Sequence, residues 1–329
     1  MNFFIQIIII LITWYITVLV HEFGHFFFGK ITGYKFVSFK IFNFEIVKIN
    51  NKLKLMKTVS FPEGQCLLSP PQDFYKTNFT LYNLGGSLFN FIYAIITLIL
   101  LFFVKNEILF DFLFINFLVN LSVGILNIFP INSKSIVNDG YNLLLCKKSE
   151  QNRKAFYNIL KVNALEKQEF YLKDMPEEIF HIGEEDKIEN TLSLGNGINK
   201  LNYIYDLTKD LDLYEKNILE ILNKNTCEYG LFKYYLIGEL LFLKIIKNSK
   251  KEEIEEIVTE DNLKMLKKYS SIFPSISRDL YTYELLFNKN EKDIGIYLKK
   301  YHKIIKTIVS KSDKKREEEF FYLINKENL

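Results

Sequence analysis

Three apolar stretches, each long enough to cross a lipid bilayer, dominate the first 131 residues of the chain. The first covers residues 3–28, and its opening positions, 3–20, carry no charge. A helix of that uncharged length spans about 27 Å, close to the thickness of the hydrocarbon core. The other two stretches cover residues 84–104 and 112–131, with a short loop between them. The pattern predicts three transmembrane helices, of which the last two form a hairpin.

A cleaved signal peptide is the competing interpretation of the first stretch. Such a peptide has a basic segment before its apolar run and a small-residue cleavage site after it. Met1 and Asn2 supply no charged side chain. The pattern therefore favours a first helix that is retained.

The segment between the first and second stretches has a different period. Residues 36–60 alternate between apolar and polar side chains as strands do, and Asn50-Asn51 fits a hairpin turn. Residues 64–68 add a short apolar run before a pair of prolines. We expect a small, strand-rich β-hairpin loop over residues 36–69.

Composition changes near residue 145. The first 145 residues carry 10 Lys, no Arg and 7 acidic residues, whereas the remaining 184 carry 32 basic and 32 acidic residues. Apolar side chains in residues 146–329 recur at helical spacing, which predicts a soluble all-α domain that binds a partner protein or regulates the first domain. Stacked, repeat-like helical hairpins and an ordinary helical bundle both fit. Because charges of both signs are interspersed, no nucleic-acid partner is expected.

Lysines between the first two spans indicate the orientation in the membrane. Residues 30–76 hold eight Lys and three acidic residues, whereas the N-terminus and the last hairpin loop hold almost no positive charge. Cytoplasmic loops carry the excess of Lys and Arg. We therefore expect a multi-pass protein of a bacterial cell membrane, surrounded by lipid, with its N-terminus outside and residues 146–329 in the cytoplasm.

The sequence His21-Glu22-Phe23-Gly24-His25, at the end of the first stretch, carries the clearest chemistry. His21 and His25 are one helical turn apart, so they project from one face and can share a metal ion, while Glu22 can accept a proton from water. A pair of interfacial histidines is the alternative, but ionisable groups at a membrane boundary are costly unless they are functional. The pattern favours a catalytic Zn²⁺ site, which needs a third protein ligand.

Asp139 is the candidate third ligand. It follows the third stretch, which returns to the side of the membrane where His21 and His25 lie. Asn138-Asp139-Gly140 would otherwise indicate a turn. Its place relative to the three spans makes Asp139 the expected ligand.

Asparagines inside the spans are further candidates, because polar groups there face other helices or a water-filled cavity. Asn116, Asn120 and Asn127 share one face of the third span. We expect helix contacts from the first two and a substrate contact from Asn127, which is nearest the cytoplasm. Asn90, in the second span after Gly85-Gly86-Ser87, fits packing and substrate contact equally; the glycines would permit close helix contact.

Together these elements resemble the site-2 protease family of intramembrane zinc metalloproteases. The matching elements are His21-Glu22-Phe23-Gly24-His25, Gly86-Ser87-Leu88-Phe89-Asn90 (similar to the family's Gly-x-x-x-Asn), and Asn127-Ile128-Phe129-Pro130 with Asp139-Gly140 (similar to Asn-x-x-Pro…Asp-Gly). The resemblance covers residues 1–145. Two departures are Ser87, where the family often has Pro, and the residues from Ile131 to Asn138, a longer separation than in the family pattern.

The resemblance implies a three-helix catalytic core in which His21, His25 and Asp139 bind zinc and Glu22 is the general base. The loop of residues 36–69 would present substrate as an added strand. The implied reaction is hydrolysis of peptide bonds in or near transmembrane segments of single-span proteins or membrane-bound peptides, in regulated intramembrane proteolysis or signal-peptide processing.

Two other functions fit parts of the pattern. A non-hydrolytic membrane scaffold would recruit partners through residues 146–329, but the presence of Glu22 favours the protease. A metal transporter would place ionisable residues along several spans, and the second and third stretches have none at depth.

Overall fold

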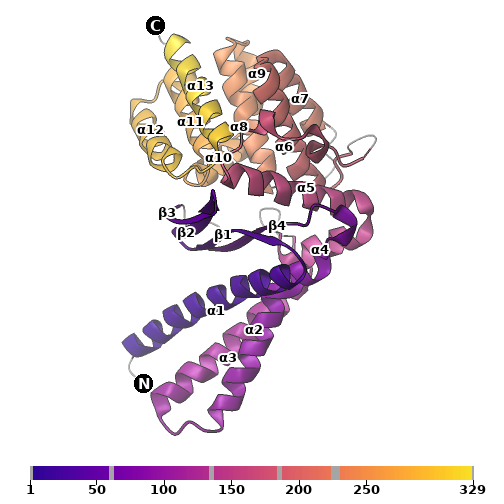
Figure 1. Ribbon diagram of the computed structural model, residues 1–329. Coiled ribbons are helices and arrows are strands. Elements are labelled where there is room, and N and C mark those ends of the chain that lie inside the picture. Colours follow the sequence, from indigo (N-terminus) through magenta and orange to yellow (C-terminus); the bar gives the residue numbers. More distant parts are fainter. Residues whose placement is uncertain (1–2, 59–62, 133–136, 184–186, 224–229, 328–329) are drawn as a thin grey trace. The chain divides into compact units, whose positions relative to one another are not determined.

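The computed structural model describes residues 3–58, 63–132, 137–183, 187–223 and 230–327, which are mainly helical with one small sheet (Figure 1). The chain divides into two compact units between Ala164 and Leu165, within the last turn of α5 (Glu150–Lys167). This division lies one helix later than the change in composition, because Phe156 of α5 packs its ring against Phe79 and Tyr82, just before the second predicted span. We call the two parts the membrane unit and the helical domain.

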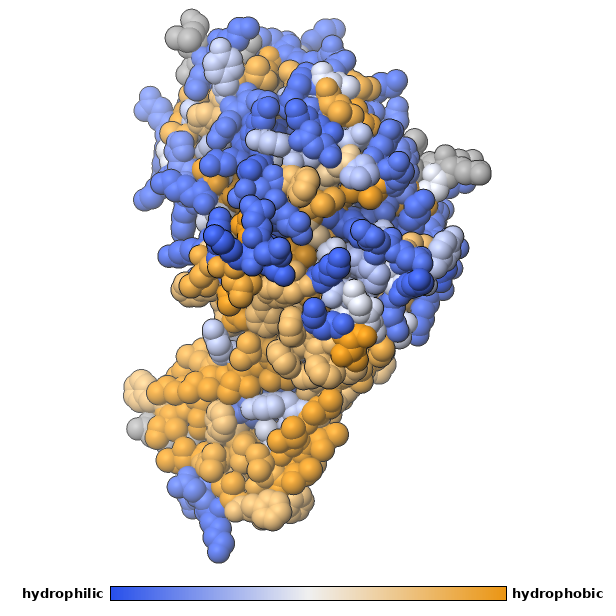
Figure 2. Space-filling model, in the orientation of Figure 1, coloured by the Kyte–Doolittle hydropathy of each residue, from blue (hydrophilic) through white to orange (hydrophobic). Residues whose placement is uncertain are grey.

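Three helices of the membrane unit are long and apolar enough to cross a membrane: α1 (Phe3–Ile31), α2 (Phe79–Leu101) and α3 (Glu107–Ile128). Large apolar side chains cover their surface, for example Leu11 at 64% exposure and Ile99 at 52%, and the face in Figure 2 shows this cover plainly. Exposed apolar surface of this extent fits contact with lipid rather than water.

Local capping sets where the second and third spans begin. Asn78 accepts a hydrogen bond from the backbone N–H of Leu81, and Asn106 accepts one from that of Leu109. A side-chain acceptor of this kind satisfies a free N–H of the first helical turn. Both helices therefore begin about one turn before the predicted spans of 84–104 and 112–131, and both end about one turn before the predicted ends.

The predicted hairpin is part of a four-stranded antiparallel sheet in the order β3-β2-β1-β4. Its strands are β1 (Lys35–Ile41), β2 (Phe44–Ile49), β3 (Lys52–Lys57) and β4 (Gly64–Ser69). Asn50 and Asn51 join β2 to β3 with φ of 49° and 62°. Asparagine tolerates this left-handed region, so the expected hairpin turn is confirmed.

Glycines bring α1 and α2 into backbone contact beside the histidines. A Cβ on Gly24 would lie 2.2 Å from the carbonyl oxygen of Gly85, and a Cβ on Gly86 would lie 2.4 Å from Cε1 of His21. A larger residue at Gly24 would force the two helix backbones apart, and one at Gly86 would displace the His21 ring. The predicted close contact at Gly85-Gly86 is confirmed, and it places α2 directly against His21.

The helical domain is built around α8 (Gly230–Ile246), which contacts α7, α10, α11 and α13. Residues 236–243 of α8 are all buried, so this helix lies inside a core on every side, an arrangement that favours an ordinary bundle. The other helical elements are η2 (Leu172–Asp174), η3 (Glu177–Phe180), α6 (Thr191–Thr208), α7 (Leu211–Asn223), α9 (Lys251–Ile257), α10 (Glu260–Tyr269), α11 (Pro274–Thr282), η4 (Tyr283–Asn288), α12 (Glu291–Ile305) and α13 (Lys311–Glu327). The membrane unit adds η1 (Phe74–Lys76) and α4 (Asp139–Lys148).

Candidate metal centre

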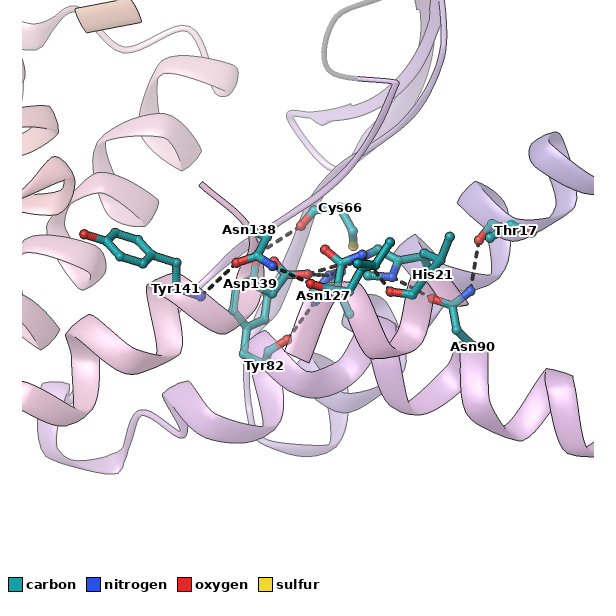
Figure 3. Close-up of polar contacts among 12 residues, drawn as sticks. Thr17, His21, Cys66, Tyr82, Asn90, Asn127, Asn138, Asp139 and Tyr141 are labelled. Atoms are coloured by element: carbon teal, nitrogen blue, oxygen red, sulfur yellow. Dashed lines mark hydrogen bonds and ion pairs between the residues drawn. The ribbon is translucent and has the colours of Figure 1, made fainter. Parts of the chain in front are cut away.

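The three predicted metal ligands lie together at one end of the spanning helices. Oδ2 of Asp139 is 3.0 Å from Nε2 of His21 and 3.2 Å from Nε2 of His25, and the two Nε2 atoms are 3.2 Å apart (Figure 3). Zinc bonds of about 2.0–2.2 Å at tetrahedral angles separate neighbouring ligand atoms by roughly 3.3–3.6 Å. The donor set therefore has the chemistry and nearly the spacing of a three-ligand zinc site.

Asp139 reaches the histidines because Asn138 ties α4 to the end of α3. The Asn138 side-chain oxygen accepts from the backbone N–H of Tyr141, at 3.0 Å, and from that of Ile131, at 3.0 Å. Its amide nitrogen donates to two carbonyls at the end of α3, each at 2.7 Å. Asn138 is thus both the N-cap of α4 and a clamp that fixes the first helical residue, Asp139.

The long connection between Pro130 and Asp139 closes at its base. Asn132 and Val137 form an antiparallel bridge, and the N–H of Asn138 lies 3.4 Å from the carbonyl oxygen of Ile131. Residues 133–136 lie outside the described part of the chain. The two ends of this connection are therefore adjacent, and its extra length leaves Asp139 beside the histidines.

Glycine is also required where α4 begins. A Cβ on Gly140 would lie 2.3 Å from the carbonyl oxygen of Ile128, at the last residue of α3. Gly140 therefore lets the first turn of α4 pack directly against the end of α3. This packing places the neighbouring Asp139 beside the histidines.

Asp139 is suited to be an ionised ligand. Burial favours its neutral form, but the positive charge of His25 and hydrogen bonds from His21 and His25 outweigh burial, so the pKa of the Asp139 carboxyl lies below its ordinary range. An ionised carboxylate beside two imidazoles forms a donor set that attracts a divalent cation.

Each histidine has a partner behind it that leaves Nε2 for the metal. Nδ1 of His25 is 2.7 Å from the carbonyl oxygen of Tyr82, and a carbonyl only accepts, so Nδ1 carries a proton and Nε2 is the atom that could bind a metal. Nδ1 of His21 is 2.7 Å from Oδ1 of Asn90. Metal-bound histidines commonly donate their other N–H in this way.

Glu22 is buried at the boundary between α1 and the sheet. A Cβ on Gly64, the first residue of β4, would lie 2.6 Å from its Oε1. Its carboxylate also interacts electrostatically with both histidines and with Asp139. The candidate general base is therefore buried within electrostatic range of the donor set, at the start of an edge strand.

The predicted substrate contacts are placed differently from one another. Asn90 is fully buried, and its two side-chain polar atoms contact His21, Asn120 and the carbonyl of Thr17. Asn127 is half-buried, and its amide donates to the carbonyl of its own helix four residues earlier. A substrate contact by Asn127 stays a prediction, while the surroundings of Asn90 favour support of His21.

Sequence reasoning missed two contributors to the centre. Tyr82 acts through its backbone oxygen, which any residue possesses, so its identity gives no signal. Asn138 fits a turn in the sequence, although an Asn directly before an acidic first turn is also a typical N-cap pattern that predicts the start of a helix.

Among the described residues, no other group of three or more His, Cys, Asp or Glu side chains brings its ligand atoms within 4.8 Å of one another. The centre is therefore distinct within that part of the molecule.

Comparison with known protein families, curated proteins and solved structures finds no match for this chain.

Proposed function

We propose that this chain is an intramembrane zinc metalloprotease of the site-2 protease type. The observation that carries the proposal is the convergence of His21, His25 and Asp139 at the end of an apolar helix, with Glu22 buried within electrostatic range of them. Its substrates are single-span membrane proteins or membrane-bound peptides, cleaved in or near their transmembrane segments.

The side chains divide the work of hydrolysis. A zinc ion held by the three ligands would polarise a peptide carbonyl and lower the pKa of water. Glu22 accepts a proton from the attacking water at its carboxylate and returns it to the nitrogen of the departing amine. The new bond joins the water oxygen to the carbonyl carbon, and the carbon–nitrogen bond breaks.

The sheet offers a way to hold the substrate. A transmembrane helix hides its carbonyls in hydrogen bonds, so it must unwind before cleavage, and pairing with an edge strand stabilises the unwound form. Strand β4 is an edge strand, and its first residue, Gly64, lies against Glu22. An unwound segment along β4 would therefore bring a peptide bond to the general base.

The distribution of lysine supports the rest of the proposal. The excess of Lys in residues 30–76 favours a cytoplasmic position for the sheet and the metal centre in a bacterial cell membrane. The helical domain would then lie in the cytoplasm, where it recruits a partner protein or regulates cleavage.

The proposal is tested by cleavage of a panel of single-span substrates in detergent. The Glu22→Gln variant keeps the shape of the side chain but loses the base, so we expect the rate to fall about 100-fold or more while zinc is retained. Glu107→Gln makes the same chemical change at the first residue of α3, whose other end lies near the metal centre, and should leave the rate unchanged. Equal cleavage by the wild type and Glu22→Gln would contradict the protease assignment, and a lack of cleavage by either protein would favour the scaffold.

A further inference from the structure

A chain of amide hydrogen bonds runs from His21 into the interior of the spanning helices. Asn90 of α2 contacts His21 on one side, and its Nδ2 donates to Oδ1 of Asn120, in α3, at 2.8 Å. Nδ2 of Asn120 donates to Oγ1 of Thr17 at 3.0 Å. Both asparagines are fully buried, so each contact forms away from water (Figure 3 shows Asn90 between His21 and Thr17).

A backbone carbonyl fixes which way the Asn120 amide points. One side of this amide lies 2.9 Å from the carbonyl oxygen of Asn116, one turn earlier in α3. A carbonyl oxygen accepts hydrogen bonds and cannot donate, so the nitrogen of Asn120 must face it. The oxygen of Asn120 is therefore turned toward Asn90.

The same reasoning fixes Asn90. One side of its amide faces the oxygen of Asn120 and, at 3.3 Å, the carbonyl oxygen of Thr17, which are both acceptors. Its nitrogen must lie on that side, so its oxygen faces Nδ1 of His21 at 2.7 Å. His21 therefore carries a proton on Nδ1 and turns Nε2, the atom that could bind a metal, toward Asp139 and His25.

We propose that Asn90 is a positioning residue that fixes the tautomer and ring orientation of His21, rather than a contact for the substrate. The inference rests on the proposed metal centre. It makes the two histidines unequal, because the fold supplies the partner of His25 through a backbone carbonyl, while the partner of His21 is a side chain that substitution can remove.

The test measures the affinity for Zn²⁺ of the full chain in detergent, by competition with a chromophoric chelator. Removing an outer partner of a metal-bound histidine lowers metal affinity about 10–100-fold, so Asn90→Leu should show a loss in that range. Asn116→Leu is the matched control, because Asn116 is also fully buried and bonded across the bundle, to Thr13, but does not contact His21. Its zinc affinity should stay within about threefold of the wild type.

A conservative variant separates positioning from packing. In Asn90→Asp, a carboxyl oxygen keeps the acceptor toward Nδ1 of His21, so zinc affinity should recover most of what Asn90→Leu loses. Visible absorption of Co²⁺ bound in place of zinc should change in Asn90→Leu and not in Asn116→Leu, since it reports the geometry of the ligands.

The possible results lead to different conclusions. Wild-type zinc affinity in Asn90→Leu, or equal losses in Asn90→Leu and Asn116→Leu, would overturn the positioning role. A raised KM with unchanged zinc affinity would instead assign Asn90 to the substrate. Unchanged zinc affinity in His25→Ala would mean that the metal centre itself is wrong. If the leucine variants do not fold, Asn90→Ala and Asn116→Ala provide the same comparison.

Discussion

The membrane unit and the helical domain bury different kinds of polar side chain. Inside the three spanning helices the buried polar groups are mostly neutral, and Asn90, Asn116 and Asn120 each hydrogen-bond across to a neighbouring helix. The helical domain instead buries a fully enclosed guanidinium, that of Arg278, against carboxyl groups.

The buried charges of the helical domain are paired with one another. Arg278 lies 2.9 Å from Glu239, 2.7 Å from Asp279 and 2.9 Å from Glu317, and its guanidinium also stacks between two phenylalanine rings. Three carboxyl groups thus surround one cation. In the metal centre, by contrast, two imidazoles and one carboxylate turn their ligand atoms toward a single point.

The two regions therefore illustrate two uses of buried charged groups: pairing with one another, and converging to bind an external ion. Charges that compensate one another hold helices together, and removing one partner leaves the others uncompensated. Acceptor atoms that converge on one point are suited to bind an external cation. The cost of burial is therefore offset by compensating charges in the helical domain and, in the proposed metal centre, would be offset by a bound cation.

The largest expected effect comes from Arg278→Leu, which tests whether the paired charges stabilise the helical domain. Breaking a buried ion pair leaves uncompensated charges, so we expect the helical domain to lose about 3–5 kcal/mol of stability. Hydrogen exchange of α8, α11 and α13 in the full chain measures this loss. Lys251→Leu, at an exposed lysine of the same domain 3.3 Å from Glu255, should cost less than about 1 kcal/mol. A small effect at Arg278 would contradict a structural role for the cluster.

A glycine-to-alanine pair should give opposite signs in the two regions. Gly24→Ala places a Cβ against the backbone of α2 and should destabilise the membrane unit by about 1–3 kcal/mol. A Cβ on Gly295, inside α12, would meet no atom within 4 Å, so Gly295→Ala should stabilise its helix by about 0.5–1 kcal/mol. Trp14 is the chain's one tryptophan, so its fluorescence follows unfolding of the membrane unit alone.

If Gly24→Ala left the unfolding of the membrane unit unchanged, the close contact between α1 and α2 would be wrong. Loss of stability in Gly295→Ala would show that its helix packs against a neighbour. Hydrogen exchange of α12 provides the second measurement.

The helical domain should also depend on pH. Burial raises the pKa of the Glu317 carboxyl to about 7, although the charge of Arg278 opposes the shift. The groups facing it are Arg278, Asp279, Glu239, Arg316 and Asp313. Because the folded state holds this proton above the unfolded pKa, the contribution of Glu317 to stability is fully present below about pH 4.5 and is lost, by roughly 3 kcal/mol in total, as the pH rises through about 7.

The Glu317→Gln variant should flatten this dependence, since it removes the titrating group and keeps an oxygen for Arg278. Denaturation of the full chain between pH 4.5 and 8, followed by hydrogen exchange of α13, measures the slope. A slope that persists unchanged in Glu317→Gln would assign the titration to another carboxyl group.

Features set by local sequence were predictable. The spans followed from uncharged length, the hairpin turn from Asn50-Asn51, and the first two ligands from the spacing of His21 and His25. Each depends on residues within a few positions of one another. The early starts of α2 and α3 depend on single capping asparagines, a local signal that the apolar pattern overlooks.

Features that join distant residues were harder to predict. From the sequence, Asn90 fits packing and substrate contact equally, and its role beside His21 emerges only once the distance between them is known. The charges around Arg278 look like those of a solvated helix face, because the sequence does not show that α8, α11 and α13 bring Glu239, Asp279 and Glu317 together around it. Asp139 could be predicted only because the number of spans determines the side on which it emerges.

The zinc content of the purified protein tests the central claim, convergence of three ligands, most directly. We expect about one zinc per wild-type chain, and a large loss in Asp139→Ala, since two histidines alone hold zinc weakly. Asp73→Ala removes an exposed carboxylate of the membrane unit and should leave the zinc content unchanged. Zinc at the wild-type level in Asp139→Ala would contradict the assignment of the third ligand.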